Sequence, residues 1–252
     1  MQLAKPNAHR STPNAHCSMP NATNIKQQLL SFGNPEKAEH AKYFFKTGKG
    51  QYGEGDIFIG CTVPESRSVA RANKNLSFTE LKKLLDDEIH ECRFCALVIL
   101  NEQFKKAEEE KRKEIVDFYL RHTHRVNNWD LVDVSAYNIL GEWLQDKPRG
   151  ILYDLARSEN LWEQRIAVVS TMAFIRHHDF HDMLQLSEHF LTHRHDLMHK
   201  ACGWMLREAG KRDEKTLTAF LDKHAANMPR TMLRYAIEKL PPSQRKHYLQ
   251  KK

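Results

Sequence analysis

The 252-residue sequence predicts an all-α protein, an α-solenoid of antiparallel helix pairs. Nearly every segment after Ile25 has the apolar spacing of an amphipathic helix, and strand patterns are almost absent. The helices are about 10 to 15 residues long with short polar connections, which favours antiparallel neighbours. The second helices of successive pairs also recur with a period of about 35 residues, as expected for a repeat protein.

The sequence divides into a low-complexity, disordered tail over residues 1–24 and a single domain of helical repeats over residues 25–252. Three seven-residue copies, PNAHRST, PNAHCSM and PNATNIK, follow one another and offer no apolar face to bury. Three side chains in these copies could in principle bind a metal: His9, His16 and Cys17. A tail without metal is the interpretation that its composition favours.

Start signals mark two of the predicted helices. Asn34 and Pro35 supply an N-cap and a first-turn proline, and Ser77 and Glu80 fit a capping box. A glycine-rich loop at residues 48–60 separates the first of these helices from a helix that is expected to start near Pro64. Together with these two, the expected helices begin at Ile25 and near Pro64 and cover residues 35–47, 77–88, 90–104, 109–123, 127–140, 147–158, 160–176, 180–193, 196–211, 213–224 and 229–240.

Small residues reveal the repeat when the second helices of the pairs are aligned. They recur at intervals of 71, 34 and 35 residues: Ala96, Ala167, Ala201 and Ala236. The first interval equals two units, and the missing member falls near Leu131. A helix pair repeated at this length is typical of HEAT-like repeats. The second helices should therefore form one layer and line one concave surface.

The segment NNWDLVDVSAYNIL contains the first candidate site residues. Trp129 and Asp133 are four residues apart and share a helix face, and an aromatic ring beside a carboxylate suits a cation. Arg165 and Trp204 lie on the next two helices of the same layer, so the four side chains can converge. Asp130 lies on a different face and is interpreted as a first-turn acid favoured by the helix dipole.

Each candidate has an alternative role that the residues alone leave open. Trp129 could anchor the core from the first turn, and Asp133 could be an ordinary surface residue. Arg165 could be a solvated residue of the repeat. Trp204 could serve packing, because the adjacent Gly203 permits a close helix approach.

The composition favours a cytoplasmic protein with a polyanionic partner. The chain has 39 Lys and Arg against 32 Asp and Glu, a net charge of +7, which favours nucleic acid without establishing it. No apolar stretch reaches the roughly 20 residues of a membrane helix, and an apolar signal-peptide core is missing, so no membrane is expected. Five cysteines, an odd number, disfavour a disulfide framework.

Three patterns resemble sites but are not interpreted as such. The segment GKGQYG at residues 48–53 matches a dinucleotide fingerprint by its letters, but it follows a helix and not a strand. Cys92 and Cys95 form a lone CxxC without a second pair at zinc-finger spacing. The 15 histidines give no ligand pattern. No metal and no cofactor are expected.

Several segments together resemble the AlkD-like DNA alkylation-repair glycosylases, a family of HEAT-like repeat proteins. The segments are NPEKAEHAKYFFKT, GEGDIFIGCTVPESR, NNWDLVD, LWEQRIAV and HKACGWMLREAGK, and the resemblance runs from about Ile25 to about Leu240. It implies a concave DNA-binding face that holds duplex DNA with the lesion in or near the base stack. It also implies excision of positively charged N3- and N7-alkylated purines, such as 3-methyladenine and 7-methylguanine, in base excision repair.

The resemblance implies a catalytic set of four residues: Trp129, Asp133, Arg165 and Trp204. Arg165 is also expected to contact DNA beside the lesion. Arg207 shares a helix face with Trp204, and Arg207 and Lys200 are the further candidates for DNA contacts. The expected partner is duplex DNA with alkylated bases, bound by a monomer.

The proposed chemistry is physically consistent with these residue types. A purine alkylated at N3 or N7 is already positively charged, so it leaves as a neutral base without a general acid. The sugar left behind resembles an oxocarbenium ion, which a carboxylate and two indole faces are suited to stabilise. The alternative function is a HEAT-like module that binds DNA or protein without catalysis.

Overall fold

The computed structural model describes residues 20–251, and the chain is helical over most of this range. Extended pairing within the described residues is limited to one isolated bridge between Ile57 and Ile89. The all-α prediction is confirmed. Most of the expected tail, including its two histidines and its cysteine, lies outside the described residues.

The α-helices are α1 (Ala22–Ser31), α2 (Pro35–Phe44), α3 (Val63–Ala72), α4 (Phe78–Leu85), α5 (His90–Lys106), α6 (Glu109–Arg121), α7 (Trp129–Ala136), α8 (Gly150–Ala156), α9 (Leu161–Ser170), α10 (Met172–Arg176), α11 (His181–His189), α12 (Asp196–Gly210), α13 (Glu214–His224), α14 (Arg230–Ala236) and α15 (Pro242–Gln250). Shorter helical segments are η1 (Thr123–Arg125), η2 (Tyr137–Gly141) and η3 (Phe190–Thr192). None of the helices between residues 20 and 251 is long and apolar enough to cross a membrane.

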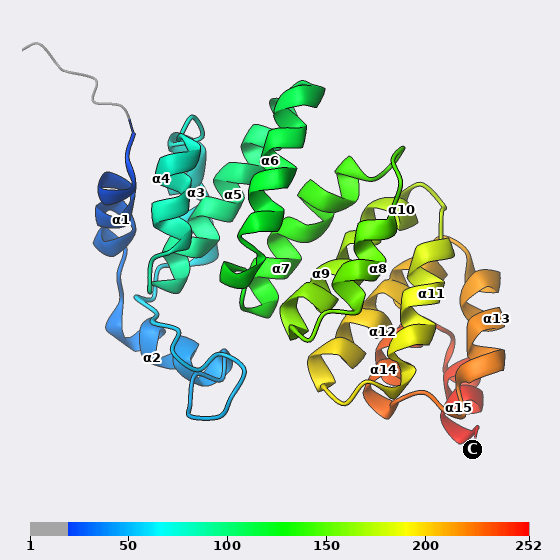
Figure 1. The fold of residues 1–252 in the computed structure, drawn as a ribbon. Coiled ribbons are helices and arrows are strands. Elements are labelled where there is room, and N and C mark those ends of the chain that lie inside the picture. Colours follow the sequence, from blue (N-terminus) through cyan, green and yellow to red (C-terminus); the bar gives the residue numbers. More distant parts are fainter. Residues whose placement is uncertain (1–19, 252) are drawn as a thin grey trace, which may run out of the picture.

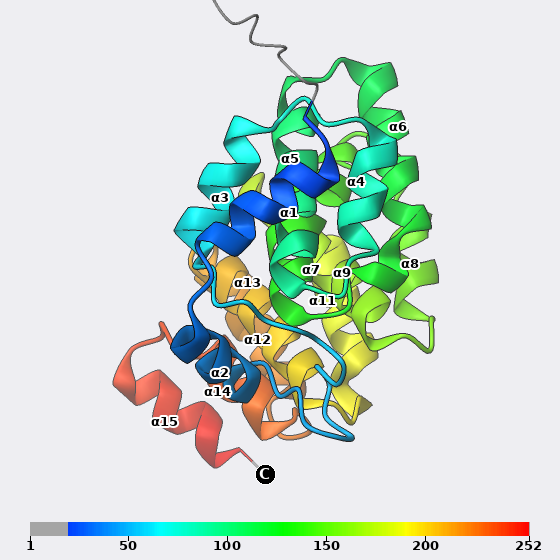
Figure 2. The same ribbon diagram turned by 90° about the vertical axis from the view of Figure 1, so that its left-hand side faces the viewer.

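The helices are arranged as a solenoid. Helices α3, α5, α7, α9, α12 and α14 pack on one another in this order and form one layer, while α4, α8 and α11 pack against α5, α9 and α12. Figure 1 shows the array running from α1 in blue to α15 in red, with α2 and the loop after it to one side. Figure 2 views the array from its N-terminal end, with α1 in front. The predicted solenoid, with the second helices in one layer, is confirmed.

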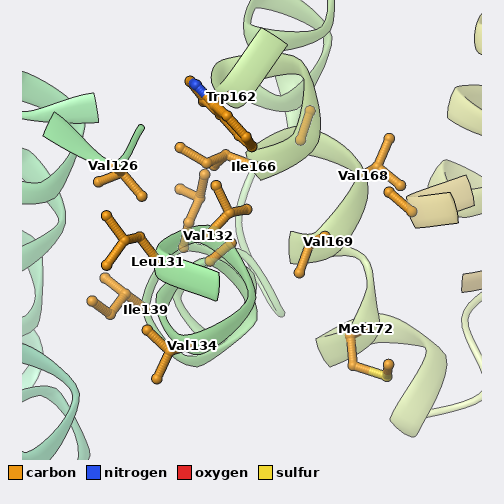
Figure 3. Packing of buried hydrophobic residues seen from close by; sticks show 14 of the residues in the cluster. Val126, Leu131, Val132, Val134, Ile139, Trp162, Ile166, Val168, Val169 and Met172 are labelled. Carbon is orange, nitrogen blue, oxygen red and sulfur yellow. The ribbon is translucent and has the colours of Figure 1, made fainter. Parts of the chain in front are cut away.

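Buried apolar side chains hold neighbouring helices of this layer together. Leu131 and Val132 of α7 and Ile166 of α9 are completely buried, and Figure 3 shows them in one cluster with Trp162. Each buried side chain of this kind contributes about 1.5 to 3 kcal/mol. This packing fixes α7 relative to α9, the two helices that carry Asp133 and Arg165.

Helices α12 and α14 approach each other closely at Gly203. A Cβ atom on Gly203 would lie 2.5 Å from the Cβ of Tyr235 and 2.6 Å from the carbonyl oxygen of Met232. The expectation that Gly203 permits close helix approach is confirmed. This contact positions the helix that carries Trp204.

The long helix expected at residues 160–176 is interrupted at Thr171. The hydroxyls of Ser170 and Thr171 donate to main-chain carbonyls about one turn earlier, each at 2.7 Å, and such bonds compete with regular helical ones. The Ser170 carbonyl also lies against Gly141, where a Cβ atom would be only 2.3 Å away. The interruption therefore accompanies a tight contact with the preceding repeat.

The capping box expected at Ser77 and Glu80 is only half formed. The Ser77 hydroxyl accepts from the main-chain N–H of Glu80, at 3.4 Å. The Glu80 carboxylate instead accepts from the N–H of Ala22 at 2.8 Å, so it caps α1 and joins it to α4. A complete capping box lies at Thr62 and Glu65, at the start of α3.

The ends of the domain extend beyond the expected helices. Helix α1 begins at Ala22, three residues before the expected start at Ile25, with Asn21 as its N-cap. Helix α15 was not predicted, because Tyr248 is its only buried residue and its sequence shows no apolar stripe.

Candidate active site

A cavity of about 840 Å³ opens between α2 with its following loop and the helices α7, α9, α12 and α14. All six candidate residues line it: Trp129, Asp133, Arg165, Lys200, Trp204 and Arg207. The shared face of Trp129 and Asp133 follows from their spacing on α7. Arg165 and Trp204 reach the same cavity because α9 and α12 are the next two helices of the layer.

Asp133 and Arg165, which both line the cavity, form a bidentate ion pair. Arg165 donates from Nε to Asp133 Oδ1 at 3.0 Å and from Nη2 to Oδ2 at 2.9 Å. Such paired hydrogen bonds fix both the position and the plane of the carboxylate. Burial raises the pKa of Asp133 above its ordinary value, and the guanidinium opposes that rise by stabilising the charged form.

Arg165 is built into the framework and is not a solvated residue of the repeat. It is 4% exposed, and its Nη1 donates to the carbonyl of Leu197, in the first turn of α12, at 2.7 Å. One guanidinium thus links α7, α9 and α12. It offers little surface to DNA while it is paired with Asp133.

Trp129 is half-buried and forms part of the cavity wall. Its indole stacks on Phe45, with ring centroids 5.3 Å apart and planes 15° apart, and Phe44 meets it edge to face at 5.7 Å. Its main-chain N–H donates to the side-chain oxygen of Asn128 at 2.8 Å. The residue therefore packs against the core and also presents surface to the cavity.

Helix α12 contributes Trp204 and two cations to the cavity lining. Trp204 is half-buried against the core. Lys200 Nζ lies 2.9 Å from Asp196 Oδ2, four residues earlier on α12, and Arg207 is paired with Glu238. Both cations are held by carboxylates, so contact with a phosphate requires an exchange of partners.

Residues of α2 and the glycine-rich loop close the cavity from the N-terminal side, which the sequence reasoning missed. Tyr43 and Phe44, at the end of α2, are 77% and 53% exposed, although large aromatic side chains are usually covered. Lys46 lies 4.7 Å from the centre of the Tyr43 ring. Tyr52 of the loop lines the same cavity, with its ring 6.5 Å from that of His195. The dense aromatic and basic segment KYFFK was the available signal.

Asp130 is the first-turn acid that was expected, and it has a second role in addition. It lies in the first turn of α7, but its Oδ2 is hydrogen-bonded to Nε2 of the buried His90 at 2.8 Å. It is therefore an ion-pair partner of α5 as well as a first-turn acid.

The CxxC cysteines belong to the core. Cys92 and Cys95 are completely buried in α5, and burial raises the pKa of the Cys92 thiol to about 12. Within residues 20–251, no group of three or more His, Cys, Asp or Glu side chains is arranged to hold a metal ion.

Fold and site together define a helical-repeat protein with an acidic and aromatic cavity bordered by cations. The family model described as DNA alkylation repair enzyme matches residues 25–240, and the chain belongs to this family. A role in DNA alkylation repair follows from that membership. No curated protein matches the chain.

Among solved structures, the chain is similar to a predicted DNA alkylation repair enzyme from Enterococcus faecalis. The two share 17% sequence identity with a TM-score of 0.63, over 83% of this chain and 97% of that one. At this identity the likeness shows the fold, and it extends across nearly the whole neighbour.

Proposed function

We propose that the protein is a DNA N-glycosylase that excises positively charged N3- and N7-alkylpurines from duplex DNA. The observation that carries the proposal is the convergence of Asp133, Trp129 and Trp204 on one cavity. A carboxylate flanked by two indoles is complementary to positive charge, and both the lesion and the reaction's transition state are positively charged.

The reaction needs no protein acid. The bond between C1′ and the purine nitrogen breaks, its electron pair goes to the purine, and the base departs neutral. The Asp133 carboxylate stabilises the positive charge that develops on the sugar and orients the attacking water. The water oxygen bonds to C1′, and one water proton passes to the carboxylate and from there to solvent. Arg165 holds both carboxylate oxygens, so Asp133 is oriented before the substrate arrives.

The cations at the cavity support a duplex DNA substrate. Lys46, Lys200 and Arg207 line it on both sides and can exchange their present partners for phosphates. We propose that DNA is held by its backbone, with the lesion kept in or near the stack. Trp129 and Trp204 then face the damaged nucleotide from the cavity walls.

The decisive experiment measures release of 7-methylguanine and 3-methyladenine from methylated duplex DNA. Asp133→Asn keeps the size of the side chain but removes its charge, so excision should fall roughly 10²- to 10³-fold, the effect of losing one preorganised electrostatic group. DNA affinity and the melting temperature are measured alongside, to separate loss of chemistry from loss of binding or folding.

Asp182→Asn is the matched control. Asp182 is a buried carboxylate on α11 that accepts from Arg149 at 2.7 Å and from Tyr153 at 2.6 Å, and it does not line the cavity. This variant should lose stability and keep its excision rate at temperatures where it is folded.

Neutral lesions test the charge requirement. Uracil and ethenoadenine carry no fixed positive charge and should be released poorly, because a carboxylate, a guanidinium and two indoles supply no acid to protonate the departing base. An Asp133→Asn protein with the wild-type rate would refute the mechanism. Wild-type protein that binds methylated duplex without releasing base would identify a non-catalytic module instead.

A further inference from the structure

A buried cluster of charges lies directly behind Trp129. His90 of α5 is 2% exposed and bridges two carboxylates, with Nδ1 3.1 Å from Asp56 Oδ2 and Nε2 2.8 Å from Asp130 Oδ2. Arg93, one turn further along α5, donates to the other oxygen of Asp56. The cluster joins the glycine-rich loop, α5 and α7.

The same cluster fixes the residues on both sides of Trp129. Asn128 is completely buried and donates from Nδ2 to Asp56 Oδ2 at 2.9 Å. Its side-chain oxygen in turn accepts from the main-chain N–H of Trp129. Asp130, the next residue, is bonded to His90. The backbone that carries the indole is therefore anchored on either side of it.

A stack of rings connects the cluster to the indole itself. Phe58 lies on the His90 ring, with centroids 4.5 Å apart, and Phe45 lies on Phe58 at 4.8 Å. Trp129 stacks on Phe45 at 5.3 Å. A change in the position of His90 is thus transmitted to Trp129 through both backbone and rings.

The arrangement requires His90 to be protonated. Both ring nitrogens face carboxylate oxygens, and only the imidazolium can donate from both. Burial alone would lower the pKa of His90, but the charges and hydrogen bonds of Asp130 and Asp56 outweigh it and raise the pKa to about 9. With Arg93 included, two cations balance two carboxylates.

Two other charged groups adjoin the cluster. Glu91, beside His90 on α5, accepts from the main-chain N–H groups of Ile59 and Gly60 and holds the loop. Lys37 of α2 and Asp130 line a second cavity of about 270 Å³ beside the cluster.

We propose that the Asp56–His90–Asp130 cluster is a positioning device for Trp129 that works only while His90 carries its proton. The inference rests on the proposed glycosylase function in one respect: it assigns His90 and Asp130 to the support of that active site. Loss of the proton leaves two carboxylates facing a neutral ring and releases the indole from its position. Excision then falls, while DNA binding by the distant cations persists.

The first test follows tryptophan emission between pH 6.5 and 9.5 in the protein without DNA. Wild type should show a transition near pH 9, which Trp129→Phe should lack although it retains the other three tryptophans. In Asp130→Asn the transition should move to lower pH, because His90 loses a charge that favours its protonated form. Absence of a Trp129-dependent transition would overturn the inference.

The second test measures single-turnover excision of 7-methylguanine over the same pH range, corrected for release without protein. Wild-type excision should decline as the pH rises through about 9. Asp130→Asn should be roughly 10- to 100-fold slower at pH 7, the scale of a misplaced active-site group, and its decline should begin at lower pH. His90→Gln should be slow at every pH and lack this decline.

Asp182→Asn again separates positioning from stability, because it breaks a buried ion pair away from the cavity. It should lower the melting temperature and leave the pH profile unchanged. If Asp130→Asn matched this control in rate and profile, the cluster would be merely structural. If the emission titrates but no protein releases base, the glycosylase proposal fails and the positioning of Trp129 stands.

Discussion

Single residues around the cavity are held by charges of opposite sign. Arg165 holds Asp133, Asp196 holds Lys200, and Glu238 holds Arg207. Burial of the Asp133–Arg165 pair has a desolvation cost that its hydrogen bonds must offset. The pair therefore serves to orient the carboxylate more than to stabilise the fold. The exposed pairs are worth about 0 to 1 kcal/mol each and can open for a phosphate at little cost.

The pH dependence of stability is a prediction at this scale. The pKa of His90 is about 9 in the folded protein, against an unperturbed value of 6.5. The folded state therefore keeps a proton that the unfolded chain releases, and stability must fall as the pH rises through this window. The contribution of protonated His90 to the free energy of unfolding is fully present below about pH 6.5 and amounts to about 3 kcal/mol.

Urea unfolding at pH 6.5 and pH 9.5 measures this contribution. Wild type should lose more free energy of unfolding between the two pH values than His90→Gln, which has no group to titrate there. Equal losses in the two proteins would show that His90 does not carry the excess proton.

At the scale of elements, helices with an apolar stripe were predictable, and contacts between distant segments were not. The four-residue spacing of Trp129 and Asp133 places both on one face of any helix, so their shared cavity could be anticipated. The bond between His90 and Asp130 joins residues 40 positions apart, and no local pattern encodes it. The hydrogen bond from the Ala22 N–H to the Glu80 carboxylate was not predicted for the same reason.

The loop wall of the cavity shows the same limit. Gly60 has a φ of +79°, a left-handed conformation that favours glycine, and a Cβ there would lie 2.2 Å from the carbonyl oxygen of Asn34. The sequence predicted a glycine-rich loop but not the position of that loop in the fold. Its fold against α2 brings Tyr52 to the cavity.

Replacing Gly203 with alanine tests the helix contact that supports Trp204. A Cβ atom would meet Tyr235 and a main-chain carbonyl of Met232 at 2.5 and 2.6 Å, so α14 must move. We expect a loss of about 1 to 3 kcal/mol in the free energy of unfolding, the usual cost of overpacking.

Gly150→Ala is its control, since a Cβ at Gly150 meets nothing within 4 Å. This change should be neutral or slightly stabilising, because alanine favours helix. Excision by Gly203→Ala should also fall, as Trp204 and Tyr235 lie on the two displaced helices. Wild-type stability in Gly203→Ala would mean that α12 and α14 are less closely packed than described.

At the scale of the whole molecule, the solenoid brings together residues that are far apart in sequence. Its successive helices α7, α9 and α12 supply the carboxylate, the arginine and the tryptophans, while α2 and its loop supply the facing wall. The carboxylate, the arginine and the tryptophans could be predicted to lie together, because the helices that carry them recur in the sequence with the repeat period. The facing wall is not part of the repeat, and only the folded chain shows its position.

The salt dependence of DNA binding tests this molecular arrangement. Cations that contact phosphates displace counterions, so affinity for duplex DNA should fall steeply with salt, by about 0.9 in logarithmic slope for each contact. Lys200→Ala should weaken binding and lower that slope by about one. Lys113→Ala is a matched control, since Lys113 on α6 is also paired with an aspartate four residues away, at 2.8 Å, and does not line the cavity. If both variants changed the slope equally, DNA would not be bound selectively at the cavity. An affinity for duplex DNA that does not depend on salt would contradict binding through phosphate contacts altogether.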